Sequence, residues 1–230
     1  RTRAAMIEYR PASDLGETDL AWLQARHHFC FAGYQDVERL EWGRTRYLNH
    51  DVLAARAELQ PSFHFATDML LIVDEGEIQI TRPADRDIAI GQNRFACIVA
   101  GTGAEFGIAN RSGRPASFTT VALKSAADEP AVFREASSLS AVADWLASGA
   151  DDDVAHVRLR APARVKWLDL SGGQVIDLQL AREYAYLVVI DGTIAAAGHR
   201  MTRHDGLAIR NESRLSVAAE TPATLLLIEG

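Results

Sequence analysis

An apolar strand that ends in an acidic residue and a glycine occurs twice in this chain. Residues 71–76 spell LIVDEG and residues 187–192 spell LVVIDG, and a second short apolar run follows each copy. Self-similarity at a fixed offset marks a duplicated structural unit. Short strands around hairpin turns build β-sandwiches or β-barrels. The repeat therefore predicts an all-β chain made of two similar barrels.

The segment between the two sets of strands has a different composition. Residues 124–130 are rich in Ser, Ala, Asp, Glu and Pro, which is typical of a linker. A helical pattern follows, which Ser138 or Ser140 can cap and Gly149 can end. Its apolar face would consist of Leu139, Val142, Trp145 and Leu146. We therefore expect an N-terminal barrel over 1–130, a linker with a short helix over 131–153 and a C-terminal barrel over 154–230.

The N-terminal half allows three further local predictions. The apolar pattern of residues 63–73 predicts one long strand. Two edge-like strands would flank a turn at Asn49. Residues 19–23 would form a short helical turn with Trp22 and Leu23 on the core side.

Composition limits the partners and the location of such a chain. Of its 230 residues 48% are apolar, so each half can bury a core. The formal net charge is -7 and the basic residues form no long run, which argues against direct nucleic-acid binding. No apolar stretch approaches the roughly 20 residues that span a bilayer, so no membrane partner is expected. No signal peptide is visible, although the chain starts at Arg1; we expect a cytoplasmic monomer.

Neither the cysteines nor any known catalytic motif in the sequence indicates an enzyme. Cys30 and Cys97 each lie in an apolar, strand-like run, so we expect buried reduced thiols rather than a disulfide. The sequence has no nucleophile elbow, no His-Glu-x-x-His and no dinucleotide-binding fingerprint. No intact catalytic constellation follows from the sequence.

Two pairs of histidines allow structural interpretations. His27 and His28 are adjacent, so on a strand they would point to opposite sides, one packed and the other exposed. His199 and His204 lie in a polar turn, where we expect them to be solvated.

Four blocks of the sequence resemble the pirin-like bicupin family. Residues 22–36 (WLQARHHFCFAGYQD) and 47–53 (YLNHDVL) resemble two successive N-terminal signatures of that family. Residues 100–103 (AGTG) resemble the loop before its second metal motif, and residues 205–209 (DGLAI) resemble a strand signature of its C-terminal domain. The resemblance covers nearly the whole chain and is strongest for bacterial members with a degenerate metal site. It implies an all-β fold of two cupin-type β-barrels, a bicupin, with a short linking helix.

The resemblance also implies where a metal would be held. Metal-binding members use a His-x-His pair and a His-x-Glu pair to bind one metal, usually iron. Residues two apart on a strand point to the same face, so each pair can face the barrel interior. Here the first pair falls on Ser62 and His64, and the second on Phe106 and Ile108. A useful metal site needs about three or four protein ligands, so we expect no metal and no other cofactor.

The same positions predict a small ligand pocket in the N-terminal barrel, with no catalytic residue. Phe106 would fill the vacated metal position and contact His64. A small apolar or aromatic ligand would use His64 and Ser62 as polar contacts. The hypothesis is a pirin-like bicupin with a degenerate metal site, acting as a non-catalytic small-molecule-binding or regulatory protein whose protein partner is not identified. The predicted pocket residues are Ser62, His64, Asp68, Phe106 and Ile108.

Two alternatives remain open at this point. A metal-dependent, quercetinase-like dioxygenase would need a site rebuilt around His64, with Asp68 at the same strand parity as a second ligand. If Phe106 faced outward, Glu105 would face inward and become a metal ligand. The other alternative is a structural remnant that binds no ligand.

Overall fold

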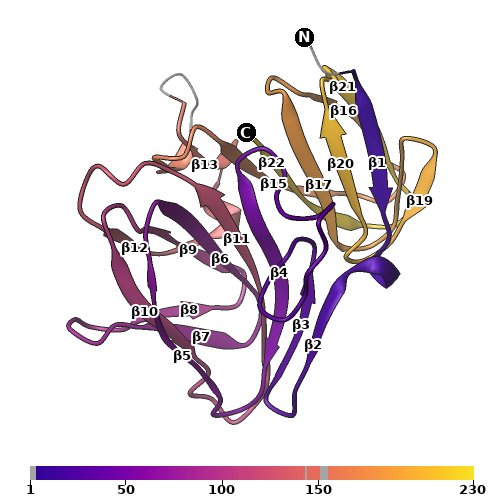
Figure 1. Ribbon diagram of the computed structural model, residues 1–230. Helices are drawn as coiled ribbons and strands as arrows, with labels where there is room; N and C mark the ends of the chain where they lie inside the picture. The colour runs from indigo at the N-terminus through magenta and orange to yellow at the C-terminus, as the bar shows by residue number, and fades with distance from the viewer. Residues whose placement is uncertain (1–3, 143, 151–154) are drawn as a thin grey trace.

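The computed structural model describes residues 4–142, 144–150 and 155–230, and nearly all of its regular elements are β-strands (Figure 1). The strands form two units, each built from a seven-stranded and a four-stranded sheet around an apolar core. This confirms the all-β fold with two barrels.

The N-terminal unit contains two sheets of neighbouring strands. Its larger sheet is ordered β12 (Val132–Ser138), β9 (Arg94–Val99), β6 (Thr67–Glu75), β11 (Ala116–Lys124), β4 (Thr45–Leu53), β3 (Leu23–His27) and β2 (Gly16–Asp19). Its smaller sheet is ordered β5 (Glu58–His64), β10 (Ala104–Ala109), β7 (Glu77–Thr81) and β8 (Ile88–Gly91).

The C-terminal unit repeats this arrangement. Its larger sheet is ordered β1 (Met6–Arg10), β20 (Gly206–Arg210), β17 (Tyr184–Asp191), β22 (Ala223–Glu229), β15 (Arg164–Leu170), β13 (Trp145–Ser148) and β14 (Ala155–Arg158). Its smaller sheet is ordered β16 (Val175–Gln179), β21 (Arg214–Ala219), β18 (Ile194–Ala196) and β19 (His199–Met201).

The two repeated strands, β6 and β17, explain why the sequence repeat is apolar at successive positions. On β6, Leu71 faces the core of the N-terminal barrel, whereas Leu70 and Ile72 face a third core shared by both units. On β17, Leu187 faces its own barrel and Val188 faces the shared core. Strands that are buried on both faces lose the apolar–polar alternation. The two barrels therefore pack face to face through their large sheets.

The glycines of the repeat are required by the hairpin turns. Gly76 and Gly192 have φ angles of 78° and 83°, a left-handed conformation that L side chains rarely adopt. A Cβ atom at Gly192 would also lie 2.2 Å from the carbonyl oxygen of Pro222. Each repeat thus ends in a turn that only glycine fits without strain.

The sheets cross the expected domain limits at two places. β1 lies near the N-terminus, yet it pairs antiparallel with β20 in the C-terminal unit, as Figure 1 shows. β12 lies within the expected linker, yet it pairs with β9 and completes the N-terminal sheet. The chain therefore begins in the C-terminal unit with β1, forms the N-terminal unit with β2 to β12, and returns to the C-terminal unit at β13. Residues 1–3 and 151–154, at the edges of the expected domains, lie outside the described residues.

The prediction of a linking helix is wrong. The segment forms β12, a single 3-10 turn at η2 (Leu139–Ala141) and then strand β13. β13 pairs with β14 and β15, and this pairing buries Trp145 and Leu146. The burial of β-favouring Trp145 in a sheet outweighs the helical spacing of the apolar residues, because tertiary contacts override a weak local propensity.

Three local predictions in the N-terminal half are also wrong. Residues 63–73 do not form one strand, since Ala66 has a φ of 49° and separates β5 from β6. Asn49 lies inside the continuous strand β4 and is not in a turn. Trp22 is 41% exposed in the hairpin between β2 and β3, where a helical turn was expected. A 3-10 turn does occur earlier, at η1 (Ala12–Asp14).

No helix among the described residues is long and apolar enough to cross a bilayer.

Candidate functional site

The structure brings Ser62, His64 and Phe106 into contact at the mouth of the N-terminal barrel, and Ile108 lies in the same barrel core as Phe106. Strands β5 and β10 pair there with Phe106 opposite Ser62. The Phe106 ring is buried and stacks on the His64 ring, with 4.6 Å between the ring centroids. The Ser62 hydroxyl lies 3.0 Å from Nε2 of His64. The predicted contact between Phe106 and His64 is confirmed; we call Ser62, His64, Phe106 and Ile108 the barrel-mouth site.

The orientation of β10 decides which side chains reach this site. Phe106 and Ile108 are 2% and 7% exposed and belong to the barrel core. Glu105 precedes Phe106 on the same strand, so it has the opposite parity, and it is exposed. Side chains on a strand alternate between its two faces, so Glu105 points away from the barrel interior. The alternative in which Glu105 faces inward is therefore wrong.

Asp68 does not join the barrel-mouth site. The left-handed residue Ala66 interrupts the strand, so the parity expected from residues 63–73 is not kept. Asp68 is buried on the side of β6 that faces the C-terminal unit. Its Oδ2 accepts hydrogen bonds from the backbone N–H groups of Arg160 and Ala161, each at 2.7 Å. Asp68 therefore connects the two units and is not a partner of His64.

The residues present at the barrel-mouth site do not fit the metal that the family resemblance implies. His64 is the single imidazole there, and Phe and Ile carry no donor atom. Within the described ranges, no group of three or more His, Cys, Asp or Glu side chains is arranged to hold a metal ion. Burial lowers the pKa of His64, which keeps its ring neutral. The ring is thus available as a hydrogen-bonding group.

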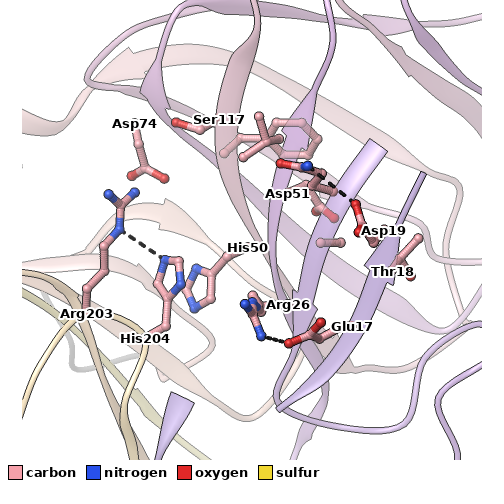
Figure 2. A pocket seen from close by; sticks show the side chains of 14 residues that line it. Glu17, Thr18, Asp19, Arg26, His50, Asp51, Asp74, Ser117, Arg203 and His204 are labelled. Carbon is pink, nitrogen blue, oxygen red and sulfur yellow. Dashed lines mark hydrogen bonds and ion pairs between the residues drawn. The ribbon is translucent and has the colours of Figure 1, made fainter. Parts of the chain in front are cut away.

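A second candidate site is a cleft of about 500 Å³ between the two units (Figure 2). Its walls come from β2, β3, β4, β6 and β11 of the N-terminal unit and from the turn that precedes β20. We call it the interdomain cleft. Its ionisable lining residues are Glu17, Asp19, Arg26, His50, Asp51, Asp74, Arg203 and His204.

Two histidines stack across the cleft. The rings of His50 and His204 are nearly parallel, with an angle of 6° and 3.9 Å between centroids. Burial lowers the pKa of His204 to about 4, with a further contribution from the Arg203 and Arg26 cations, and burial lowers that of His50 well below its usual range. Both rings are therefore neutral near pH 7. The predicted solvation of His204 is wrong, whereas His199 is exposed and stacks on Tyr9.

A chain of hydrogen bonds runs from the cleft into the shared core. The Thr119 hydroxyl donates to Asp74 at 3.5 Å and lies 3.1 Å from Nδ1 of His50. Nε2 of His50 lies 3.1 Å from Nε2 of His28, whose Nδ1 lies 2.7 Å from the Tyr186 hydroxyl. Since each group can donate once, a consistent assignment has every donor directed towards Asp74. This fixes the Nδ1–H tautomer of His50 and the Nε2–H tautomer of His28.

The expected difference between His27 and His28 is wrong, because both rings are buried. The His27 ring hydrogen-bonds Asn49 and Thr18, and these bonds compensate for the hydration that the ring loses on burial. Two adjacent histidines can both be buried here because the large sheet is covered on both of its faces.

Two carboxyl groups of the cleft are short of hydrogen-bond donors. Burial raises the pKa of Asp51 to about 7 and that of Asp74 to about 6. Among the described residues, each accepts a hydrogen bond from one threonine hydroxyl, Thr120 at 3.4 Å from Asp51 and Thr119 at 3.5 Å from Asp74. An ionised carboxylate can accept about four hydrogen bonds, so both groups have unused acceptor capacity. The Asp74 carboxyl lies on the interdomain face of the large sheet with His50 and Thr119, whereas the Asp51 carboxyl lies on the barrel face with Phe118 and Thr120.

Sequence reasoning missed this cleft, although its residues lie in segments that it had singled out. His28 belongs to the block 22–36, and His50 and Asp51 belong to the block 47–53. Asp74 is the acidic residue of the first repeat. The signal was present as polar residues inside apolar strand patterns, but only the tertiary structure brings the blocks together.

The cysteines are both free thiols, as predicted. Cys97 is buried, and burial raises the pKa of its thiol, which opposes reactivity. Cys30 is only half-buried, and its Sγ lies 3.0 Å from the carbonyl oxygen of Asp36.

Comparisons with known proteins agree with the two-barrel architecture. Residues 145–229 match the family model described as "Quercetinase C-terminal cupin domain". The chain is 33% identical over 234 residues to a protein of Pseudomonas aeruginosa named "Putative quercetin 2,3-dioxygenase", covering 97% of this chain and 99% of that one. It is 26% identical to the pirin-like protein YhaK of Escherichia coli, with the same coverage.

A solved structure gives the same result for the fold. The bacterial pirin YhhW from Escherichia coli, in complex with nickel(II), superposes with a TM-score of 0.90 at 22% identity, covering 97% of this chain and 98% of that one. The relatives match along nearly their whole length, so the similarity includes both barrels. The chain therefore belongs to the pirin-like family of cupin proteins.

Proposed function

We propose that this protein is a metal-independent member of the pirin-like family that acts as a non-catalytic protein. It would bind a small organic molecule or serve a regulatory role. The observation that carries the proposal is the stacking of the buried Phe106 ring on His64 at the positions where the family resemblance implies metal ligands. An aromatic ring at van der Waals distance from the one remaining imidazole takes up the space that a metal and its water would need.

The barrel mouth supplies the kinds of contact that a small apolar or aromatic ligand uses. His64 is half-buried and hydrogen-bonds Ser62, so both can orient a polar group of a ligand. Phe65, next to His64 in the chain, is 57% exposed and offers aromatic surface. Small-molecule sites commonly combine apolar walls with a few placed polar groups.

A second candidate function is a quercetin 2,3-dioxygenase. It is favoured by the names of two relatives, the Pseudomonas aeruginosa protein and an Escherichia coli quercetin 2,3-dioxygenase that is 22% identical to this chain. The ligand set argues against it, since Ser62, Phe106 and Ile108 replace three of the four donors that the resemblance implies.

Metal content and oxygen consumption separate the two functions. Purified protein incubated with iron, nickel, copper or zinc and then desalted should retain much less than one metal ion per chain and should not consume oxygen with quercetin. The matched variant carries Ser62→His, Phe106→His and Ile108→Glu, which restores the donors, and it should gain one metal ion per chain. Near-stoichiometric metal in the unmodified protein, lost on His64→Ala, would overturn the proposal and support the dioxygenase.

A further inference from the structure

The ring of His204 covers the ring of His50 in the interdomain cleft. The two rings lie face to face with 3.9 Å between their centroids, and His50 is only 6% exposed (Figure 2). His50 is the residue through which the cleft meets the buried hydrogen bonds of His28 and Tyr186. The His204 ring therefore shields one face of His50 at the point where this buried chain reaches the cleft.

A hydrogen bond from Arg203 requires His204 to be neutral. Nε of Arg203 lies 3.3 Å from Nε2 of His204, and a dashed line marks this contact in Figure 2. An arginine Nε always carries its hydrogen, so Nε2 of His204 is the acceptor and its proton lies on Nδ1. Protonation of His204 places a second N–H on Nε2 and turns the contact into one between two donors. The hydrogen bond is then lost, and two positive charges repel each other.

The groups around His204 do not compensate for a new positive charge. Asp205 already accepts two backbone N–H hydrogen bonds, each at 2.7 Å, and Glu17 is paired with Arg26. The charge of Arg203 already acts on Asp74. Burial, together with the Arg203 and Arg26 cations, lowers the pKa of His204 to about 4. The charged and titratable groups that surround the ring are Arg203, Asp205, Arg26, Glu17, His50, His28 and Asp74.

The side chain of His204 can move while the backbone of its turn stays in place. The His204 N–H donates to the carbonyl oxygen of Val189 at 2.7 Å, and Asp205 fixes the turn through its backbone hydrogen bonds. The ring is half-buried and is held by the hydrogen bond from Arg203 and by the stack on His50. Rotation of the side chain would take an imidazolium from the stack into the water of the cleft, where hydration stabilises its charge.

We propose that the His204 side chain is a proton-operated lid: it lies on the His50 ring when it is neutral and turns into the cleft when it is protonated. The lid controls the access of water to the buried chain through His50, His28 and Tyr186. It does not depend on what the barrel mouth binds, because its residues belong to the large sheet and to the interdomain turn.

The size of the effect follows from the two positions of the ring. The stacked ring has a pKa of about 4, and the released ring would have its ordinary value of 6.5. Since the released state binds the proton more tightly, acid favours it. The ratio of released to stacked rings should rise about a hundredfold between about pH 7 and about pH 4.

NMR titration of the histidine ring protons tests this movement. The His204 ring current shifts the resonances of the stacked His50 ring, so both sets of resonances should move with one midpoint as the pH falls. His204→Asn is the matched variant, because Asn tolerates the left-handed φ of 69° at this position but cannot be protonated. Its His50 resonances should lie at the unstacked position at every pH.

Two arginine variants test the repulsion. Arg203→Gln removes the cation at Nε2 and should raise the midpoint of the His204 titration. Arg214→Gln removes the same charge from an exposed position in the C-terminal small sheet and should leave the midpoint unchanged. Equal midpoints in Arg203→Gln and the unmodified protein would contradict the role of Arg203.

Three results of the titration would overturn the lid. A His204 midpoint near 6.5 would show that the ring is not stacked in solution. Movement of the His204 resonances without those of His50 would show that the protonated ring stays on the stack and that Arg203 moves away. Loss of all dispersed resonances at this midpoint would show that unfolding of the protein, and not a side-chain rotation, takes up the proton.

Discussion

At the scale of single residues, Phe106 shows how a position that the family resemblance assigns to a metal ligand is here part of the barrel core. Its ring stacks on His64 and also makes an edge contact with Phe133, with 6.0 Å between centroids. Burial of such a ring contributes apolar transfer energy and close packing at once.

Phe106→Ala should therefore destabilise the protein by about 3–5 kcal/mol, because it removes a buried ring and leaves a cavity. Urea unfolding followed by fluorescence measures the change in the free energy of unfolding. Phe65→Ala is the matched control, since Phe65 is 57% exposed and its removal should change little. A loss below about 1 kcal/mol in Phe106→Ala would show that the barrel mouth is loosely packed.

Asp51 gives a pH-dependent prediction. Burial raises its pKa to about 7 from an ordinary value of 3.8, so between these values the folded protein holds a proton that the unfolded chain has released. The folded state then loses stability as the pH rises from about 4 to about 7. Asp51→Asn removes this loss, and the variant should gain stability over the unmodified protein towards pH 8, by up to about 4 kcal/mol.

The measurement is the difference in thermal or urea stability between Asp51→Asn and the unmodified protein at several pH values. Asp74 and the buried histidines titrate in both proteins, so their contributions cancel to first order in the difference. Asp177→Asn, an exposed control, should show no such trend. A difference that stays constant from pH 4 to pH 8 would mean that Asp51 ionises normally in the folded state.

At the scale of elements, the contacts of β13 explain why residues 145–148 form a strand and not a helix. Trp145 is 8% exposed, and the guanidinium of Arg164 and the ammonium of Lys166 lie 4.0 and 5.0 Å from its ring centroid. A strand places the ring against the neighbouring strand β15, which carries both cations. Cation–π contacts of this kind add to the apolar burial.

Trp145→Ala should lower the free energy of unfolding by about 3 kcal/mol, since the ring is buried and its packing partners stay in place. Trp22→Ala is the control, because Trp22 is 41% exposed in a hairpin. Chemical denaturation of both variants tests the prediction. Equal stability of the two variants would place β13 outside the cooperative structure.

At the scale of the whole molecule, the two units are joined by more than a linker. β1 belongs to the C-terminal sheet although the chain then continues into the N-terminal unit, and the shared core draws on both large sheets. Asp68 adds two hydrogen bonds to the backbone of the other unit. Neither unit can unfold without exposing the shared core.

We therefore expect a single unfolding transition, with equal calorimetric and van't Hoff enthalpies. Asp68→Ala should lower the stability of the whole molecule by about 3 kcal/mol, because it leaves two buried N–H groups unpaired. Differential scanning calorimetry tests both statements. Two separate transitions, or a shift of one of two transitions in Asp68→Ala, would show that the units unfold independently.

The sequence by itself determined the all-β class, the duplication and the orientation of β10. The repeat at residues 71–76 and 187–192 follows from turns that need glycine and from strands buried on both faces, and these are local requirements. The inward position of Phe106 follows from the alternation along one uninterrupted strand. Strand alternation, together with the ligand pairs that the family resemblance implies, therefore sufficed to predict the contact between Phe106 and His64.

Tertiary structure alone decided the place of Asp68, the strand at Trp145 and the interdomain cleft. A single left-handed residue at Ala66 reset the strand alternation, and no pattern in the flanking residues signals it. His50 and His204 are more than one hundred and fifty residues apart in the chain, and their stacking depends on how the two large sheets pack. Contacts between distant segments depend on burial summed over the whole molecule, which no local pattern encodes.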